Sequence, residues 1–357
     1  SSDLSEYAPD DNYAKILKVQ DIDDPKPKAD EVVFEVKSAA LNYNDIWGMR
    51  GVPVPVPLPH VSGSDAAGDV IAVGDDVKNI KVGDKVVSHS NMSCRVCKAC
   101  TDGREFDCIK RTIWGFQTGP NWGAFQEVTH LPEVNVSKIP EGLSYDQAAA
   151  ASMTILTSWH MLVGRAKITP GQTVLIMGGG SGVGSFGIQI AKLYNCDVIA
   201  TASPDKLDKC LELGADFAVD HRKDDWHKEV RAISKELAKK KGEAPGIDLS
   251  FDHIGETHWN KQLQLLKYGA TLVSCGATTG YNAQTDLRHV FFKGTNILGS
   301  TQGTKAELDQ ALYWMGQGKI KAAIDSTYTF EQAAEAHTKM LTGKGMFGKI
   351  LMKPEGA

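Results

Sequence analysis

Between residues 32 and 127 the apolar residues form short β-rich runs, separated by clusters of glycine, proline, asparagine and aspartate. Short runs bounded by turn-forming residues are typical of strands in a mostly β structure. The predicted strands are Val32–Val36, Val70–Val73, Lys85–Val87 and Phe125–Val128. The first part of the chain is therefore predicted to be rich in β-structure.

From Thr173 onward the pattern changes, because apolar runs alternate with amphipathic stretches. Such alternation predicts strands joined by helices, and therefore a parallel, doubly wound sheet of about six strands, as in the Rossmann dinucleotide-binding fold. The predicted strands are Val174–Met177, Val198–Ala202, Phe217–Val219, Leu249–Asp252, Thr271–Cys275 and Asn296–Ser300, with helices at Val183–Tyr194 and Asp205–Leu213. The middle of the chain is thus predicted to be an α/β domain.

After Thr304 the pattern predicts a further helix, strand, helix and strand. These are Lys305–Met315, a strand near Thr327–Phe330, Gln332–Leu341 and Lys349–Met352. We interpret them as the chain returning to the first domain. Two domains are therefore predicted, one made of residues 1–160 and 303–357 and the other of residues 161–302.

The composition narrows the classes of partner. The net charge of -5 is spread along 357 residues without a basic arm, which argues against nucleic acid as a partner. The one compact basic run, Lys239–Lys241, is predicted to be a solvated helix end. The N-terminal residues lack a basic start and an apolar stretch, and no segment approaches the roughly 18 apolar residues that cross a membrane. A cytoplasmic protein without membrane contact is expected.

A glycine cluster at Gly178–Gly184 directly follows a predicted strand and precedes a helix. Glycines in this place let the backbone approach a pyrophosphate, whose charge the helix N-terminus favours. Ser181 replaces the middle glycine of the G-x-G-x-x-G pattern in the register that ends on Gly184. The alternative is a plain tight turn, but the strand-turn-helix setting favours a nucleotide cradle. Its predicted residues are Gly180, Ser181, Gly182, Val183 and Gly184.

The position that distinguishes NAD from NADP lies about 20 residues further on, where NAD-binding folds carry a carboxylate. Here it is Ser203, followed by Lys206. With His221 or Arg222 after the third strand, these side chains are suited to a 2′-phosphate, so NADPH is the predicted cofactor. The alternative is that Lys206 and Arg222 are only exposed surface charges. We also assign Thr157, Gly276 and Ala277 to the cofactor site.

Four of the seven cysteines lie within fifteen positions, as Cys94-x2-Cys97-x2-Cys100-x7-Cys108. Four thiolates at this spacing close a tetrahedral shell and leave no position for water or substrate. One structural zinc is therefore predicted, against the alternative of four unliganded surface thiols, which would oxidise. The remaining cysteines are predicted to be small core residues. They are Cys196, Cys210 and Cys275.

The order of motifs resembles the zinc-containing alcohol dehydrogenase and quinone oxidoreductase superfamily, the medium-chain dehydrogenases/reductases, over essentially the whole chain. The motifs are Asn42–Asp45, Gly63–Gly68, the four-cysteine lobe and the glycine cluster. The resemblance implies a GroES-like catalytic domain, a Rossmann domain and an active site between them. It also implies a homodimer or homotetramer built by extending the Rossmann sheets.

The alcohol dehydrogenases of that superfamily hold a catalytic zinc on a Cys, a His-Glu pair and a further Cys or Asp. The matching positions here are Asn42, Ser64-Asp65 and Met153 or a neighbour. A catalytic zinc needs three ligands from His, Cys or carboxylate, and only Asp65 is one. We therefore predict no catalytic zinc, which leaves hydride delivery to a conjugated carbon, where hydrogen-bond donors suffice for the developing oxyanion.

Within the superfamily, the chain most resembles enoyl-CoA reductases of the crotonyl-CoA carboxylase/reductase and acryloyl-CoA reductase type. The segments that carry this likeness are Asn42–Trp47, Gly63–Gly68, Ile113–Thr118 and Thr278–Tyr281. The four-cysteine lobe departs from the carboxylating members and favours a simple reductase. The implied catalytic residues are Asn42, Tyr43, Asn44, Phe116, Gln117 and Thr301.

Several of these residues have alternative roles. Asn42 and Asn44 either hold a substrate carbonyl or cap a turn, and Tyr43 either donates a proton or packs its ring. The carboxylating members supply a Phe-Glu pair and a His, where this chain has Phe116-Gln117 and Thr301. The prediction is an NADPH-dependent reductase of short-chain enoyl-CoA with little carboxylation. The alternatives are a quinone or enone reductase, and a protein that binds NADPH without turnover.

Overall fold

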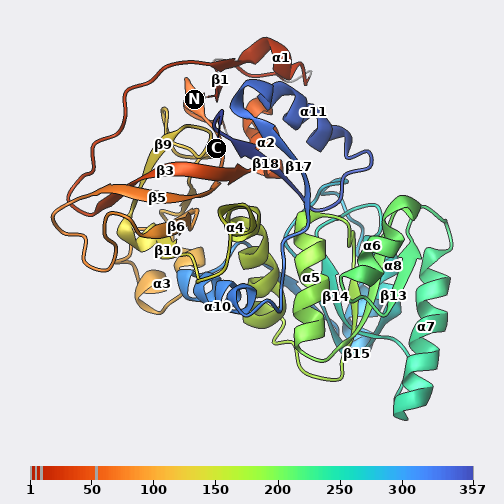
Figure 1. Ribbon diagram of the computed structural model, residues 1–357. Coiled ribbons are helices and arrows are strands. Elements are labelled where there is room, and N and C mark those ends of the chain that lie inside the picture. The colour runs from red at the N-terminus through yellow and green to blue at the C-terminus, as the bar shows by residue number, and fades with distance from the viewer. Residues whose placement is uncertain (1, 5, 9–10, 53–54, 357) are drawn as a thin grey trace. The chain divides into compact units, whose positions relative to one another are not determined.

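The computed structural model describes residues 2–4, 6–8, 11–52 and 55–356, and Figure 1 traces the chain. It divides into two compact units, which we call the first unit (residues 1–156 and 303–357) and the second unit (residues 157–302). The division falls inside helix α4 (Tyr145–Trp159), whereas the sequence pattern placed it after residue 160.

The first unit contains a seven-stranded sheet. Six of its strands follow the order β10-β6-β5-β3-β18-β17, and the seventh strand, β9, pairs with β3. The last strand of the chain lies antiparallel to β3, with Leu351 opposite Ala40. The C-terminal segment is therefore part of the same sheet as the N-terminal strands. The strands are β3 (Glu31–Ala40), β5 (Asp65–Val73), β6 (Lys85–Ser88), β9 (Val128–Pro132), β10 (Val136–Lys138), β17 (Ile324–Thr329) and β18 (Lys349–Lys353).

Strand β3 lies at the centre of this sheet and is buried along almost its whole length. It pairs with β5, β9 and β18, so few of its backbone groups lack a strand partner. Helices α2 (Tyr43–Arg50) and α11 (Ala333–Thr342) contribute Ile46 and Ala336 to the core formed around Phe34. Burial of these apolar side chains is the main force that holds the first unit together.

The predicted strand Phe125–Val128 is wrong at its start, because β9 begins only at Val128. The N–H groups of Ala124 and Phe125 bond to the carbonyls of Gly63 and Ser62. Regular pairing with β3 starts where Val128 comes opposite Glu35. Phe125 is therefore buried outside the sheet. An apolar run is buried in either place, so its composition alone does not predict a strand.

Smaller elements complete the first unit. The short strands are β1 (Ser2–Leu4), β2 (Leu17–Val19), β4 (His60–Val61), β7 (Asn91–Met92) and β8 (Thr112–Ile113). The helices are α1 (Tyr13–Ile16), α3 (Lys98–Thr101) and α10 (Lys305–Gly316), with 3-10 turns η1 (Glu105–Asp107), η2 (Glu133–Asn135) and η5 (Phe330–Gln332).

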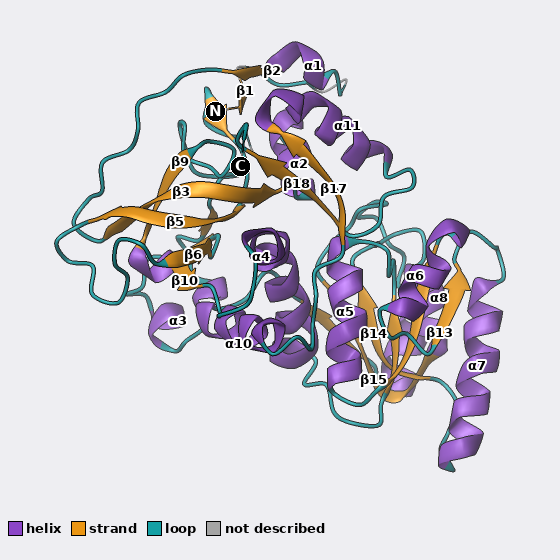
Figure 2. Ribbon diagram, viewed as in Figure 1, coloured by secondary structure: helices purple, strands orange, loops and turns teal. Residues whose placement is uncertain are grey.

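The second unit contains a six-stranded sheet with the order β13-β12-β11-β14-β15-β16, all of whose pairings are parallel. Helices connect its strands, as Figure 2 shows by colour. The predicted doubly wound sheet is therefore confirmed. The strands are β11 (Thr173–Ile176), β12 (Asp197–Ala202), β13 (Phe217–Asp220), β14 (Ile247–Asp252), β15 (Leu266–Ser274) and β16 (Asn296–Gly299).

The helical elements of the second unit include a π-helical turn that continues α4. They are η3 (His160–Arg165), α5 (Gly182–Leu193), η4 (Pro204–Lys206), α6 (Leu207–Glu212), α7 (Trp226–Lys241), α8 (Trp259–Leu265) and α9 (Leu287–Lys293). The central strand β11 is fully buried, as expected when helices cover both faces of a parallel sheet.

The basic run ends α7, which is capped by Gly242 at φ 71°. Lys239 and Lys240 are exposed, and Lys241 donates to the carbonyl of Gly171. Cationic side chains at a helix C-terminus interact favourably with the helix dipole. Across the part of the chain that the structure describes, no helix combines the length and apolar character that crossing a bilayer requires.

Candidate functional site

A buried polar cluster joins three distant parts of the first unit. Lys349 begins β18, Asp65 begins β5, and Asn42 precedes α2. The Nζ atom of Lys349 lies 3.0 Å from Oδ2 of Asp65 and 2.7 Å from Oδ1 of Asn42. It also donates to the carbonyl of Leu41 at 2.6 Å, so all three ammonium donors have acceptors. Both charged side chains are nearly inaccessible, at 4% for Lys349 and 0% for Asp65.

Asp45 supports this cluster from the first turn of α2. Its carboxylate accepts the N–H of Asn42 at 2.8 Å and the N–H of Gly63 at 3.1 Å, which fixes the two segments that carry Asn42 and Asp65. Burial raises the pKa of Asp45 to about 7, although these hydrogen bonds and the charge of Lys349 oppose the shift. The carboxylate of Asp45 therefore loses much of its hydration while it holds the segments of Asn42 and Gly63.

Every acceptor of Asp65 is engaged. Its Oδ2 accepts from Lys349 and from Nδ2 of Asn42 at 2.8 Å, and its Oδ1 accepts the N–H of Met153 at 3.0 Å. The positions that the resemblance matches to the zinc ligands of alcohol dehydrogenases, Asn42, Ser64, Asp65 and Met153 or a neighbour, include one carboxylate, which is ion-paired. Among the described residues, this cluster does not bring three His, Cys or acidic ligand atoms together.

The predicted catalytic residues of α2 lie beside this cluster. Asn44 donates from Nδ2 to the sulfur of Met153 at 3.7 Å, a weak interaction. The ring of Tyr43 meets Trp47 edge to face, with centroids 5.5 Å apart, and both rings are partly exposed. Asn42 uses one of its two amide N–H groups for Asp65.

The other predicted catalytic residues have different surroundings. Phe116 is 5% exposed and lies in the core of the first unit against Gly48. Oε1 of Gln117 accepts the N–H of Ile113 at 3.0 Å, which engages its amide in a local turn. Thr301 is partly buried after β16 and belongs to the second unit. No described hydrogen bond or ion pair links Gln117 to the Asp65 cluster.

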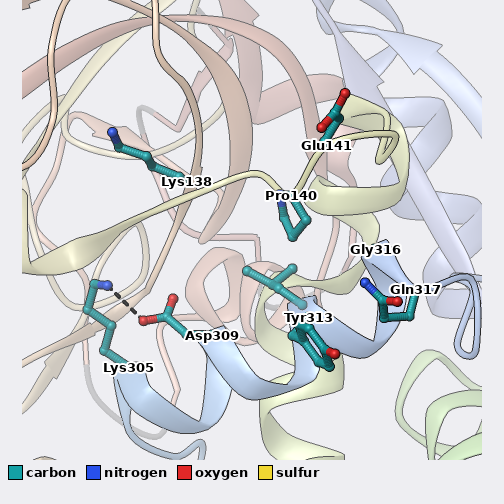
Figure 3. A pocket seen from close by; sticks show the side chains of 9 residues that line it. Lys138, Pro140, Glu141, Lys305, Asp309, Tyr313, Gly316 and Gln317 are labelled. Atoms are coloured by element: carbon teal, nitrogen blue, oxygen red, sulfur yellow. Dashed lines mark hydrogen bonds and ion pairs between the residues drawn. The ribbon is translucent and has the colours of Figure 1, made fainter.

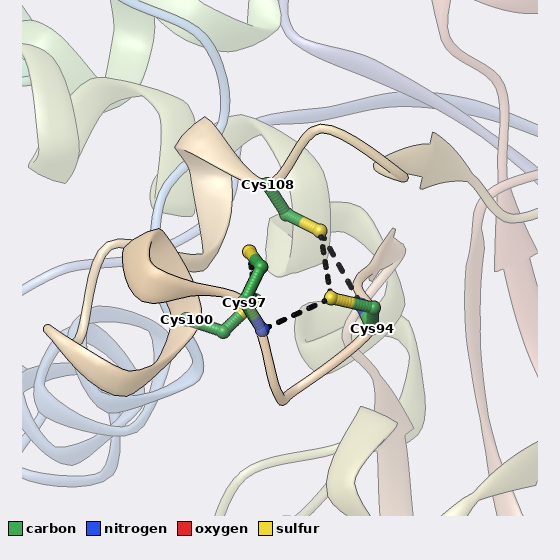
Figure 4. Close-up of side chains that lie close together, drawn as sticks. All are labelled: Cys94, Cys97, Cys100 and Cys108. Atoms are coloured by element: carbon green, nitrogen blue, oxygen red, sulfur yellow. Dashed lines mark hydrogen bonds between the residues drawn. The ribbon is translucent and has the colours of Figure 1, made fainter.

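The four predicted zinc ligands converge in a lobe around α3 and η1, as Figure 4 shows. All four sulfur atoms lie within 4.8 Å of one another, and none forms a disulfide. The Cys94–Cys108 and Cys97–Cys100 sulfur pairs are separated by 3.5 and 3.6 Å. A tetrahedral zinc with bonds of about 2.3 Å requires separations near 3.8 Å, so the residues fit this metal.

Backbone N–H groups point at these sulfurs, as suits thiolates. Cys94 N–H donates to Cys108, Cys97 N–H to Cys94, and Lys110 N–H to Cys108, at 3.3 to 3.4 Å. The other cysteines lie in the second unit, with Cys196 and Cys210 buried and Cys275 partly buried.

The glycine cluster forms the turn between β11 and α5. Ser181 is the N-cap residue of α5, and its hydroxyl accepts the N–H of Gly184 at 2.9 Å. A Cβ atom at Gly184 would lie 2.2 Å from the carbonyl oxygen of Gly178, so a side chain does not fit there. The turn therefore presents the N-terminal N–H groups of α5, the arrangement that binds a pyrophosphate.

The residues predicted to choose between NAD and NADP come together at the carboxyl ends of β12 and β13. These strands pair with Ala202 opposite Asp220, so Ser203 and His221 follow neighbouring strand ends. Arg222 lies 3.9 Å from the carboxylate of Asp205. The hydroxyl of Ser203 donates to Asp205 and is the first cause of its lowered pKa. Burial lowers the pKa of His221, and the charges of Arg222 and Lys206 add to this shift.

The remaining predicted cofactor residues also belong to the second unit. Thr157 is 8% exposed in the last turns of α4. Gly276 and Ala277 follow β15, where the backbone of Gly276 lies so close to His253 that a Cβ atom would be 2.9 Å from its carbonyl oxygen.

Sequence reasoning missed Lys349, Asp45 and His253. The signal for Lys349 was a lysine among the apolar residues Phe347–Met352, which marks a buried charge that needs a partner. The signal for His253 was its position after β14, at the carboxyl edge where parallel sheets bind ligands.

Three basic side chains, which by their charge are candidates to bind a phosphate, are engaged with other groups of the protein. Arg288 pairs with Asp286 at 2.7 Å, Lys293 donates to the carbonyls of Leu263, Gln264 and Leu266, and Lys305 pairs with Asp309 at 3.0 Å. Lys305 and Lys138 border a surface hollow of about 420 Å³ next to α10, seen in Figure 3. The acidic side chains of Asp309 and Glu141 line the same hollow, which does not favour a phosphate.

Breaking the Lys349–Asp65 pair should destabilise the protein strongly. Lys349→Met leaves a buried carboxylate without its cation, and we expect a loss of about 3–5 kcal/mol in the free energy of unfolding. Lys353→Met is the matched control on the same strand. Its partner Asp146 is partly exposed, so a loss below about 1 kcal/mol is expected. Denaturant unfolding of both variants measures the difference.

Adding Asp65→Asn to Lys349→Met should recover part of the loss, because the unpaired charge is removed. Equal losses for Lys349→Met and Lys353→Met would contradict this account of the cluster.

Comparison with known proteins agrees with this architecture. Residues 28–141 match the family described as "Alcohol dehydrogenase GroES-like domain", and residues 182–317 match "Zinc-binding dehydrogenase". A crotonyl-CoA carboxylase/reductase of Cereibacter sphaeroides is 31% identical over 91% of this chain and 80% of its own length. An acryloyl-coenzyme A reductase of Sulfurisphaera tokodaii is 29% identical over 94% of this chain and 96% of its own length. A quinone oxidoreductase of Homo sapiens is also 29% identical, over 95% of this chain and 94% of its own length.

Solved structures show the same fold. A protein described as an NAD-dependent alcohol dehydrogenase superposes with a TM-score of 0.90 at 36% identity, covering 99% of both chains. A crotonyl-CoA carboxylase/reductase in complex with NADP superposes with a TM-score of 0.87 at 25% identity, covering 99% of this chain and 94% of the other. The predicted GroES-like and Rossmann architecture is thus confirmed, and the chain belongs to the medium-chain dehydrogenase/reductase superfamily of zinc-containing alcohol dehydrogenases, quinone oxidoreductases and enoyl-CoA reductases.

Proposed function

We propose that this oxidoreductase uses NADPH to reduce the conjugated carbon–carbon double bond of a short-chain enoyl-CoA such as acryloyl-CoA or crotonyl-CoA. The observation that carries the proposal is the Lys349–Asp65–Asn42 cluster at the positions that hold a catalytic zinc in alcohol dehydrogenases. Asp65 is paired with a buried ammonium, and both of its carboxylate oxygens already accept hydrogen bonds. The names of the two enoyl-CoA reductases among the relatives support the substrate class.

The reaction requires little of the protein beyond positioning and hydrogen bonding. Bound NADPH supplies a hydride to the β-carbon, which leaves negative charge on the thioester oxygen and on the α-carbon. Hydrogen-bond donors stabilise such a charge without a Lewis acid. We assign this role to the second amide N–H of Asn42 and to Asn44, beside the Asp65 cluster. Tyr43, which is partly exposed, is the candidate proton donor to the α-carbon.

A screen of NADPH oxidation tests the proposal directly. The acceptors are acryloyl-CoA, crotonyl-CoA, their free acids, and small quinones or enones. Turnover with the thioesters and not with the free acids is expected. Quinone turnover alone would favour the alternative suggested by the human relative. Binding of NADPH without turnover of any acceptor would favour a protein that has no reductase activity.

NADPH is the proposed cofactor because Ser203 stands in place of a carboxylate, and because the charges of Lys206 and Arg222 act on His221 at the neighbouring strand end. The NADP complex of the crotonyl-CoA carboxylase/reductase supports this choice. The 36% identical neighbour is named as NAD-dependent. The proposal of NADPH therefore depends on the residues of this chain.

NADPH should be preferred to NADH, and Ser203→Asp should weaken the preference. A carboxylate there repels the 2′-phosphate, and losing one charge-assisted hydrogen bond costs about 1.5–3 kcal/mol, roughly tenfold to a hundredfold in discrimination. Lys209→Ala, a change on the exposed side of α6, is the control and should leave the preference unchanged. The ratio of kcat/KM values for the two cofactors measures it. Equal use of NADH and NADPH by the unaltered protein would show that Ser203 and Lys206 have another role.

We also propose one structural zinc per chain, on Cys94, Cys97, Cys100 and Cys108, supported by the fit of their sulfur atoms to a tetrahedral shell. A closed thiolate site contributes folding free energy and not Lewis acidity.

Metal analysis of the purified protein should give one zinc per chain, and Cys97→Ser should lose the metal together with thermal stability. Cys196→Ser changes a buried cysteine of the second unit and should keep the zinc. Two zinc ions per chain, or a Cys97→Ser protein that keeps its stability but not its chemistry, would contradict a structural role.

We propose that the reduced intermediate takes a proton and not carbon dioxide. Gln117 replaces the glutamate of the carboxylating relatives and its amide oxygen is engaged with Ile113, which supports this view. Thr301 is too short to replace the imidazole of the carboxylating relatives, which supports the same view.

Saturating bicarbonate with carbonic anhydrase should therefore yield at most a trace of carboxylated product, and Thr301→His should raise that trace. Thr301→Val, which lacks a donor, serves as the control and should not raise it. Chromatography of the acyl-CoA products gives the ratio. Mainly carboxylated product from the unaltered protein would show that Gln117 and Thr301 do not control this step.

We propose that two copies associate through β16, one of the two edge strands of the parallel sheet. An outermost strand presents unpaired backbone groups, and two such strands can pair about a two-fold axis. The neighbouring side chains of Leu287, Phe291 and Phe292 are 69 to 74% exposed, and Phe292 lies beside Tyr268. A patch of this kind favours a protein partner.

Sedimentation analysis should find a dimer, or a tetramer built from it, that Phe291→Asp shifts toward the monomer. Tyr313→Asp, an exposed aromatic position on α10, is the control and should not dissociate it. A monomeric unaltered protein would refute the interface.

A further inference from the structure

His253 occupies a position in the second unit that links two segments of the predicted cofactor site. It directly follows β14, which pairs in parallel with β11 so that Phe251 lies opposite Ile176. The glycine turn Gly178–Ser181 directly follows β11. The imidazole ring therefore comes next to this turn.

The ring is in contact with the glycine turn at two points. Nε2 of His253 lies 3.1 Å from the hydroxyl oxygen of Ser181. A Cβ atom at Gly178 would lie 2.9 Å from the same nitrogen, so the imidazole fills the space that a side chain at residue 178 would need. Gly178 itself has φ 62°, a conformation that favours glycine. The imidazole ring of His253 therefore packs closely against the glycine turn.

The backbone of His253 is held on its opposite side by the segment after β15. Its carbonyl accepts from the hydroxyl of Thr278 at 3.0 Å, and Gly276 lies against the same carbonyl. The preceding residue, Asp252, is fully buried and accepts from Gln262 and Ser274 at 2.9 Å. These contacts leave the ring little freedom to move away from Ser181.

The hydroxyl of Ser181 is engaged from two directions, by the N–H of Gly184 and by the ring of His253. A serine that only capped α5 would need the first of these. The second fixes the hydroxyl relative to the turn whose N–H groups face the pyrophosphate. Burial lowers the pKa of His253, so the ring is neutral near pH 7 and acts through its hydrogen bond and shape.

We propose that His253 is a positioning residue for the pyrophosphate of the dinucleotide, which holds Ser181 and the glycine turn in their binding conformation and couples them to the Gly276–Thr278 segment. The inference rests on the proposed binding of NADPH. Since the pyrophosphate is common to NADH and NADPH, the effect of His253 on affinity is the same for both. This separates it from Ser203 and Lys206, which act on the 2′-phosphate alone.

The experiment measures dissociation constants for NADPH and NADH by nucleotide fluorescence in four variants. His253→Phe fills the ring space without the hydrogen bond, and His253→Gln keeps a polar atom at that distance. Ser181→Ala removes the partner, and the double variant of His253→Phe with Ser181→Ala tests coupling. His227→Phe, on α7 of the same unit, is the matched control.

We expect His253→Phe to weaken both nucleotides by the same factor of roughly tenfold, the effect of one lost hydrogen bond. His253→Gln should recover most of the affinity, and the double variant should bind no more weakly than the weaker single variant. In steady-state reduction, KM for NADPH should rise while kcat at saturating NADPH stays within about twofold. His227→Phe should change none of these values.

Unchanged nucleotide affinity in His253→Phe, or an additive loss in the double variant, would overturn this inference and leave the proposed function intact. A different factor for NADPH than for NADH would also overturn it. If the unaltered protein binds neither nucleotide, the proposed function fails and this inference with it. Should His253→Phe not fold, the comparison of His253→Gln with Ser181→Ala decides, because a positioning role requires the former to bind more tightly.

Discussion

The ion pair between Lys349 and Asp65 is the interaction on which the first unit and its candidate site depend. Two charges removed from water are tolerated only when each has its full set of partners, and here the backbone of Leu41 and Met153 and the amide of Asn42 complete both sets. The two charged residues lie in β18 and β5, and their partners lie in α4 and in the segment before α2. Folding of the C-terminal segment is thereby coupled to the position of Asn42.

The same ion pair decides which chemistry is available at that position. The carboxylate of Asp65 accepts from an ammonium, an amide and a backbone N–H, so a metal would have to compete with these donors. The four cysteines, in contrast, bring four sulfur atoms within 4.8 Å of one another and receive backbone N–H donors, as suits a metal site. In the first unit, the four-cysteine lobe is therefore suited to bind zinc, whereas the Asp65 cluster is suited to hydrogen bonding.

Features that depend on local sequence could be predicted. The strands and helices of the second unit follow from their alternation, and the convergence of Cys94 to Cys108 follows from spacing within one loop. The glycine turn was recognisable because its strand and helix are adjacent in sequence. The GroES-like character of the first unit came from a resemblance and not from periodicity.

Features that depend on distant contacts could not be predicted. Lys349 and Asp65 are 284 residues apart, so no pattern along the chain pairs them. His253 meets Ser181 only because β14 and β11 are neighbours in the sheet. Gln117 was assigned to the catalytic site by resemblance to the enoyl-CoA reductases. In the structure its amide oxygen accepts the N–H of Ile113, within a local turn. The run Phe125–Val128 has strand composition, yet its first N–H groups bond to a neighbouring loop.

If the proposed reductase activity is correct, hydride transfer should need no Lewis acid at Asn42, Ser64, Asp65 and Met153 or a neighbour. The most direct measurement compares reduction of acryloyl-CoA by NADPH with oxidation of primary alcohols by NADP+, in one preparation of known zinc content, before and after adding zinc. We expect thioester reduction that added zinc does not change, and no alcohol oxidation. Alcohol oxidation that increases with added zinc would contradict it.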